Sequence, residues 1–149
     1  MTADMGEPRL IHRALTLTAA GRTLTFVCVS MGNPHAVTFE EAARGDEFYA
    51  LGPAFERHEA FPNRSNIEFT EVCAPDHLQV RVWERGSGET MACGSGACAA
   101  LVAAVTDGRA DRRATVELPG GALEIEWRGD NRVMMTGPAT PVFRGEVDV

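Results

Sequence analysis

The stretch that decides the fold reads GACAALVAAVT and spans residues 96–106. It is apolar on every side, whereas a surface helix carries its apolar residues in one stripe, so the sequence predicts a helix that is buried all round. The segment is too short to cross a membrane. Its many alanines keep the helix thin, which lets other elements pack closely around it, and Gly108 is placed to end it.

Segments with strand character lie on both sides of this helix. Residues 24–29 are rich in β-branched and aromatic types, and residues 78–82 alternate between apolar and polar types. Residues 114–118, 122–127 and 133–136 follow the helix, separated by glycine-rich turns that predict hairpins. Because strands do not alternate with helices, the expected fold class is α+β. We expect a curved, mixed, mostly antiparallel sheet wrapped around the central buried helix, and not a doubly wound α/β sheet.

The other segments predict loops and one short helix. Pro34 pushes Asn33 out of the helical region, so residues 31–35 are expected to be a loop. Residues 51–58 are expected to form a short helix with Pro53 in its first turn. Three glycines between residues 85 and 95 predict a loop there.

The bulk composition narrows the class of protein. The chain has 149 residues, 44% of them hydrophobic, which suits one domain with a real core. Its formal net charge is −7 and its basic residues are scattered, which argues against nucleic acid and anionic membranes as partners. Since no apolar run could span a bilayer and the first residues lack a signal-peptide pattern, we expect a cytoplasmic protein.

The cysteine spacing matches neither a zinc ribbon nor a Cys-x-x-Cys redox pair. We expect reduced thiols, and we interpret Cys28, Cys73 and Cys98 as structural. Cys93 differs because it opens the sequence CGSG directly before the apolar helix. The free N–H groups and positive dipole end of a helix stabilise a thiolate, so its pKa is expected to be lowered. The alternative is an ordinary glycine-rich cap around a small cysteine, and the local pattern does not decide between the two.

Other residues near this helix terminus are candidates for acid–base chemistry on a small zwitterion. Glu84 is a candidate proton acceptor and Arg85 a candidate partner for a carboxylate, although a solvated charge pair is the alternative. His35 follows Gly-Asn-Pro, and such a histidine is more often structural than a base. Asn66 is equally consistent with a turn residue. The sequence offers neither metal-ligand spacing nor a nucleotide-binding glycine loop.

Several motifs occur in the order seen in diaminopimelate epimerases. They are GNPH (residues 32–35), NIEF (66–69), ERGSGETMACGSGAC (84–98), LPGG (118–121) and MTGPA (135–139). The block from residue 84 to residue 98 is long and highly specific. From about Met5 onward, the chain therefore resembles that family.

The resemblance implies two pseudo-symmetric lobes, each a curved sheet around a central helix, with the substrate between them. Each lobe supplies one cysteine at the start of its helix. One thiolate removes the α-proton, and the opposite thiol delivers a proton to the other face. The implied activity interconverts LL- and meso-2,6-diaminopimelate for lysine and peptidoglycan precursors. It needs no cofactor and no metal.

The resemblance also implies roles for individual residues. Cys93 is the acid/base of the second lobe, and Glu84 is expected to tune it. His35 is expected to tune the cysteine of the other lobe. Gly94 and Ser95 would bind the carboxylate at the reacting centre. The full set of expected substrate-binding residues is Asn33, Asn66, Glu84, Arg85, Gly94 and Ser95.

The family's first lobe, with its own cysteine, has no counterpart in this sequence. Residues 1–14 are expected to be the remnant of an inter-lobe linker, and residues 15–149 the C-terminal lobe. We expect little activity from this chain alone, and we expect as partners diaminopimelate and either an N-terminal lobe or a second copy. The alternatives are a non-catalytic remnant or binding subunit, and a related isomerase such as a proline racemase or a phenazine-biosynthesis-type isomerase. The block from residue 84 to residue 98 disfavours the related isomerases.

Overall fold

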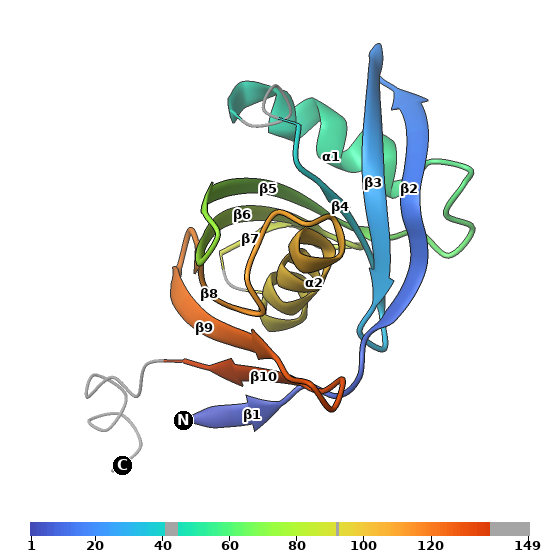
Figure 1. The fold of residues 1–149 in the computed structure, drawn as a ribbon. Helices are drawn as coiled ribbons and strands as arrows, with labels where there is room; N and C mark the ends of the chain where they lie inside the picture. Colours follow the sequence, from blue (N-terminus) through green and yellow to red (C-terminus); the bar gives the residue numbers. More distant parts are fainter. Residues whose placement is uncertain (41–44, 92, 138–149) are drawn as a thin grey trace, which may run out of the picture.

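A single curved sheet wraps around the central helix α2 (Gly94–Thr106) (Figure 1). The protein is represented by a computed structural model that describes residues 1–40, 45–91 and 93–137. Residues 96–104 of α2 are all buried, as the apolar sequence predicts. Gly108 takes a positive φ of 73° just beyond the helix, a backbone conformation that suits glycine at a helix end. The α+β fold expected from the sequence is therefore confirmed.

The sheet is mixed and mostly antiparallel. Its strands are β1 (Thr2–Asp4), β2 (Arg9–Ala19), β3 (Arg22–Ser30), β4 (Pro34–Thr38), β5 (Asn66–Ala74), β6 (His77–Glu84), β7 (Gly88–Thr90), β8 (Arg113–Leu118), β9 (Gly121–Trp127) and β10 (Val133–Thr136). Their order is β1-β10-β9-β8-β6-β5-β4-β3-β2, and β7 pairs with β6. Among the described strands, only the pairs β4–β5 and β6–β8 are parallel.

The first residues of the chain belong to this sheet. We expected residues 1–14 to be an inter-lobe linker, but β1 pairs with β10 and β2 pairs with β3. The expected boundary after residue 14 falls inside β2. The first half of this strand gives little sequence signal because every side chain from Arg9 to Ala14 is exposed. Over these residues, backbone pairing with β3, and not a buried face, keeps the strand in the sheet.

Two segments that the sequence predicts as loops contain strands. β4 begins at Pro34, so His35 lies in a strand and not in a loop, between Val29 of β3 and Asn66 of β5. Proline is tolerated there because the first residue of a strand can do without an N–H donor. The predicted loop over residues 85–95 contains β7, which forms a hairpin with β6, and α2 begins at Gly94.

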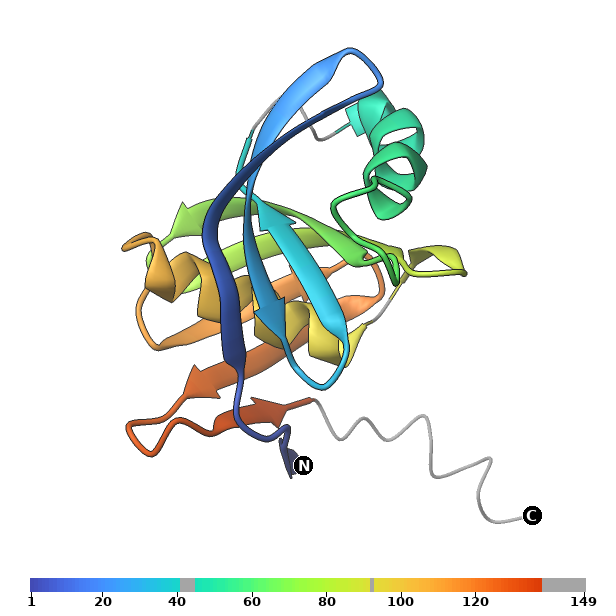
Figure 2. The same ribbon diagram turned by 90° about the vertical axis from the view of Figure 1, so that its right-hand side faces the viewer.

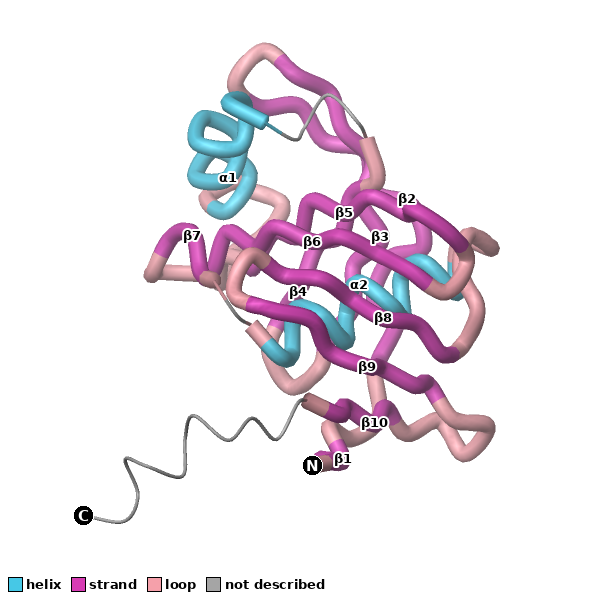
Figure 3. The backbone as a smooth tube through the Cα atoms, turned by 90° about the vertical axis from the view of Figure 1, so that its left-hand side faces the viewer, coloured by secondary structure: helices cyan, strands magenta, loops and turns pink. Residues whose placement is uncertain are grey.

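A second helix covers the outer side of part of the sheet. α1 (Phe48–Glu56) follows the 3₁₀ turn η2 (Gly45–Glu47) and starts three residues before the segment that the sequence predicts. Pro53 therefore lies in the middle of the helix and not in its first turn. In Figures 2 and 3, α1 and α2 lie apart, with strands of the sheet between them.

Strand β3 is covered on both faces because its side chains alternate between the two helices. Val27 and Val29 belong to the apolar cluster around α2. Phe26 and Cys28 belong to the cluster around α1, where the rings of Phe26 and Phe55 have centroids 5.1 Å apart. This double burial explains the nearly continuous apolar run at residues 24–29.

Of the helices in the described residues, none combines the length and the apolar character needed to cross a membrane.

Candidate functional site

Cys93 lies at the mouth of the buried helix, as the sequence predicts. It is the N-cap residue of α2, with an extended backbone (φ −129°, ψ 100°), and its carbonyl accepts a hydrogen bond of 2.9 Å from the amide of Ala97. Two residues before it, Met91 is held by the β8–β9 hairpin, where the amide of Gly120 donates a 2.7 Å hydrogen bond to the Met91 carbonyl. The thiol itself is half-buried.

The glycines around the thiol are required by close contacts. A Cβ atom at position 96 would lie 3.1 Å from the sulfur of Cys93 and 3.1 Å from Oε2 of Glu68. A Cβ atom at position 94 would lie 3.0 Å from Sδ of Met135. Both distances are shorter than ordinary van der Waals contact, so only glycine fits without movement of its neighbours. The contact at position 96 also places Cys93 and Glu68 around one small space.

The pKa of the Cys93 thiol is raised, contrary to our expectation from its position alone. Burial is the largest cause, and hydrogen bonds from the Gly96 amide and the Ser95 hydroxyl oppose it. The charges of Glu68 and Glu84 raise this pKa further. The sequence pattern indicated the helix terminus, but it could not indicate the burial that outweighs it. The surroundings of Cys93 in this lobe therefore favour the protonated form of the thiol.

The first turn of α2 also presents backbone donors. The amides of Gly94 and Ser95 lie in the turn where a helix makes no hydrogen bonds of its own, and the helix dipole favours negative charge there. Gly94 and Ser95 are both half-buried, so the turn is not sealed inside the core. The arrangement suits a small carboxylate next to the thiol.

Polar side chains lead from this turn into the interior. Asn33 donates from Nδ2 to the hydroxyl of Ser95 at 3.4 Å, and that hydroxyl lies 3.8 Å from the sulfur of Cys93. Oδ1 of Asn33 lies 3.1 Å from Nε2 of His35, whose Nδ1 lies 2.7 Å from Oε2 of Glu68. Both nitrogens of the buried His35 ring therefore have partners within this lobe. Its expected role toward a cysteine of another lobe stays a prediction.

Glu68 is a residue of the site that our sequence reasoning missed. Its side chain is 0% exposed, and within the described structure Oε1 has no hydrogen-bond partner. Burial raises the pKa of this carboxyl, while His35 lowers it and the charge of Glu84 raises it. The signal was present in the sequence, because β5 places Glu68 between Ile67 and Phe69 in a fully buried run. A carboxylate in such a run needs a special partner.

The side chain of Asn66 links β4 to the turn after β6 through two hydrogen bonds. It is 2% exposed, its Nδ2 donates to the carbonyl of Pro34 at 2.9 Å, and its Oδ1 accepts from the amide of Arg85 at 2.6 Å. The guanidinium of Arg85 is exposed and reaches the carbonyl of Asn63 at 3.3 Å. Asn66 thus holds the backbone of Arg85 in position, and its expected contact with substrate stays a prediction.

Glu84 ends β6 and is half-buried. Its charge raises the pKa values of both Cys93 and Glu68, so its carboxylate lies within electrostatic range of both groups. The turn that follows is held by Glu56 of α1, a second residue that sequence reasoning missed. Glu56 accepts hydrogen bonds of 2.9 Å from the indole of Trp83 and from the amide of Gly86. The elements thus bring together Cys93, Glu84, Ser95, Asn33 and His35, with Arg85 nearby.

The other buried cysteines differ sharply from Cys93. Burial raises the pKa values of Cys28 and Cys98 to about 12, which supports their interpretation as structural thiols. Cys73 is exposed. Across the described ranges, no group of three or more His, Cys, Asp or Glu side chains could hold a metal ion.

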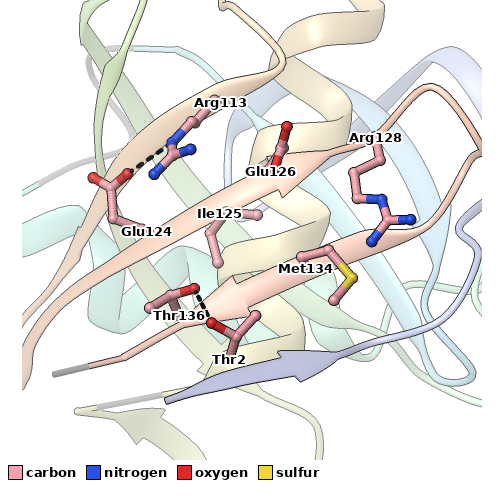
Figure 4. A pocket seen from close by; sticks show the side chains of 8 residues that line it. All are labelled: Thr2, Arg113, Glu124, Ile125, Glu126, Arg128, Met134 and Thr136. Atoms are coloured by element: carbon pink, nitrogen blue, oxygen red, sulfur yellow. Dashed lines mark hydrogen bonds and ion pairs between the residues drawn. The ribbon is translucent and has the colours of Figure 1, made fainter. Parts of the chain in front are cut away.

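A hollow on the outer surface lies away from the thiol. Figure 4 shows it over β9 and β10, with α2 on the far side of the sheet. The ion pair of Arg113 with Glu124 and the hydrogen bond between Thr2 and Thr136 cross it. It is a shallow, polar part of the sheet surface.

Comparison with known proteins decides the family. The sequence model for diaminopimelate epimerase matches residues 27–142. The chain belongs to the diaminopimelate epimerase family. It is 52% identical to the diaminopimelate epimerase of a Cyanothece species, covering 97% of this chain and 57% of that protein. It is 54% identical to diaminopimelate epimerase 1 of a Nostoc species, with the same coverage. The chain thus spans a little over half the length of these epimerases.

The fold recurs in a solved structure outside the epimerases. A "probable proline racemase" from Agrobacterium radiobacter aligns over 93% of this chain and 51% of its own, with a TM-score of 0.66 and 11% identity. That likeness concerns the fold alone.

Three residues of the epimerase motifs lie outside the described part of the chain. They are Ala92 of the block from residue 84 to residue 98, and Pro138 and Ala139 of MTGPA.

Proposed function

We propose that this chain is the C-terminal lobe of a cofactor-independent epimerase that interconverts LL- and meso-2,6-diaminopimelate. The proposal rests on the thiol of Cys93 at the mouth of the buried helix, within the residue block typical of the diaminopimelate epimerase family. A cytoplasmic location and a place in the synthesis of lysine and peptidoglycan precursors belong to the same proposal.

In this mechanism Cys93 starts the catalytic cycle as a protonated thiol and acts as the proton donor. Its raised pKa keeps the thiol protonated at neutral pH, so it can deliver a proton to a planar α-carbon. The thiolate that remains is stabilised by the Gly96 amide and the Ser95 hydroxyl. In the reverse direction the same thiolate removes the α-proton. The base on the opposite face is supplied by a partner, either an N-terminal lobe or a second copy of this chain.

The substrate's charges match the groups around the thiol. The carboxylate at the reacting centre binds the amides of Gly94 and Ser95, since this is where the helix terminus attracts an anion. The carboxylate of Glu84 tunes Cys93 and faces the ammonium groups of the substrate. Arg85 binds the distal carboxylate, with Asn33 and Asn66 beside it. This placement holds the α-carbon next to the sulfur and turns it toward the partner's base.

An epimerisation assay with and without a partner lobe tests the proposal. The N-terminal portion of the Cyanothece epimerase is fused before this chain, and LL-diaminopimelate is followed to the meso isomer by chiral chromatography. We expect turnover in the fusion, a loss of at least about a hundredfold in Cys93→Ala, and little effect of the matched change Cys98→Ala. Turnover that survives Cys93→Ala would contradict the proposal, and robust turnover by the unfused chain would remove the need for a partner.

A further inference from the structure

The contacts of the buried pair His35–Glu68 indicate how many protons the two side chains carry. Both side chains are essentially inaccessible, 1% and 0% exposed, and they meet through Nδ1 and Oε2 at 2.7 Å. The opposite ring nitrogen, Nε2, faces Oδ1 of Asn33 at 3.1 Å, and this oxygen can only accept. With the Asn33 amide in this orientation, Nε2 carries a proton. A second proton is needed between Nδ1 and Oε2, since two acceptors at that distance would repel each other.

This count makes the pair neutral as a whole. The second proton gives either an imidazolium beside a carboxylate or a neutral imidazole beside a carboxylic acid, and both forms have zero net charge. A neutral pair fits its surroundings. The groups that face Glu68 are His35 on β4, Glu84 on β6, Cys93 on α2 and Cys28 on β3. Except for His35 these groups are neutral or negative, so an uncompensated carboxylate there would be costly.

The proton on Nε2 also sets the direction of the hydrogen bonds that lead to the thiol. Nε2–H donates to Oδ1 of Asn33, so the amide presents its Nδ2–H to the hydroxyl of Ser95. The oxygen of Ser95 then acts as acceptor, and its own proton is left to point at the sulfur of Cys93, 3.8 Å away. Without the proton on Nε2 the amide would turn over, and Ser95 would donate to Asn33 instead.

We propose that Glu68 is a positioning residue: it shares a buried proton with His35, keeps Nε2 protonated, and through Asn33 directs the Ser95 hydroxyl toward Cys93. Its importance for epimerisation rests on the function proposed above. The hydrogen-bond arrangement itself does not, because it is a property of this lobe.

Nuclear magnetic resonance on the wild-type chain tests the proton count without any variant. Long-range ¹H–¹⁵N correlation spectra of the His35 ring distinguish a protonated from an unprotonated Nε2. We expect the ring proton signal on Nε2, as its contact with the acceptor Oδ1 of Asn33 requires. A ring with a bare Nε2 would overturn the proposal.

The pH profile of Cys93 alkylation tests the coupling to the thiol, with Cys93 followed by mass spectrometry of its own peptide. Glu68→Gln removes a carboxylate whose charge His35 largely offsets, so we expect its midpoint to fall by much less than in Glu84→Gln. Glu84→Gln is the matched control, because it removes one full negative charge near the same sulfur and should lower the midpoint by about one pH unit. Glu68→Leu removes the partner of Nδ1 and should raise the midpoint, since Ser95 turns away. A downward shift in Glu68→Gln as large as that in Glu84→Gln would overturn the neutral pair.

The two proposals can fail separately. If the fusion epimerises diaminopimelate but Nε2 is bare, the function stands and the role of Glu68 fails. If Nε2 is protonated and the profiles behave as expected while the fusion is inactive, the role of Glu68 in this lobe stands and the function fails. In an active fusion, Glu68→Gln should restore most of the kcat that Glu68→Leu loses.

Discussion

The amide of Gly120 donates a 2.7 Å hydrogen bond to the carbonyl of Met91, two residues before the catalytic candidate Cys93. A Cβ atom at position 120 would lie 2.8 Å from that same carbonyl oxygen. Gly120→Ala should therefore cost about 1–3 kcal/mol of folding free energy, because backbone must move to admit the methyl group. Gly129→Ala is the control, since a Cβ atom there meets nothing within 4 Å. Equal urea midpoints for the two variants would contradict this packing.

The cysteines should fall into two classes toward iodoacetamide. Cys73 is exposed and Cys93 is half-buried, so both should be alkylated in the native chain at pH 8. Cys28 and Cys98, with pKa values of about 12, should react more than about a thousandfold more slowly until the chain unfolds. Peptide mass spectrometry of a time course measures the order. Alkylation of Cys98 before Cys93 would contradict the burial described for α2.

The raised pKa of Glu68 predicts a pH-dependent difference in stability. A carboxyl whose pKa is higher in the folded state has its full contribution to stability below its ordinary value of 4.5, and loses it as the pH rises toward the folded value. Glu68→Gln lacks this loss. The free energy of unfolding of Glu68→Gln, measured relative to the wild type, should therefore increase above pH 4.5. The increase should be at most about 1.4 kcal/mol per pH unit. Urea unfolding between pH 4 and pH 8 measures this, and a constant difference would refute it.

Glu56 should matter for stability through the turn that precedes the site. Replacing it with alanine leaves the indole of Trp83 and the amide of Gly86 without their acceptor. We expect Glu56→Ala to cost about 2–4 kcal/mol, since each unpaired group costs about 1–3 kcal/mol. The exposed neighbour Glu59 supplies the control, where alanine should change stability by less than about 0.5 kcal/mol. Similar melting temperatures for the two variants would show that the turn does not depend on Glu56.

The central helix and most strands could be predicted because their signals are local. The run at residues 96–106 is apolar on all sides, and residues 78–82 alternate in type. β2 and β7 escaped prediction because backbone pairing holds them, while their side chains are mostly exposed or half-buried. The start of β4 was misjudged because Pro34 indicates a loop locally, whereas the neighbouring strands β3 and β5 impose an extended chain.

The site was predictable where a residue has a distinctive local sequence, and not where its role depends on distant partners. Cys93 was found from the CGSG sequence before the helix. Its raised pKa depends on burial and on Glu68 and Glu84, which come from other strands. Glu68 was detectable as a charge in an apolar run, but its pairing with His35 needs the parallel register of β4 and β5.

Exchange of the substrate's α-proton with solvent tests the central claim, that Cys93 is one of two bases on opposite faces of the α-carbon. In deuterium oxide, the fusion with the Cyanothece N-terminal portion should epimerise either isomer and incorporate deuterium at the α-carbon, as proton NMR can follow. In Cys93→Ser, only the partner's base remains. The account then predicts no epimerisation, with α-proton exchange confined to a single isomer. Exchange of both isomers by Cys93→Ser, or continued epimerisation, would contradict it.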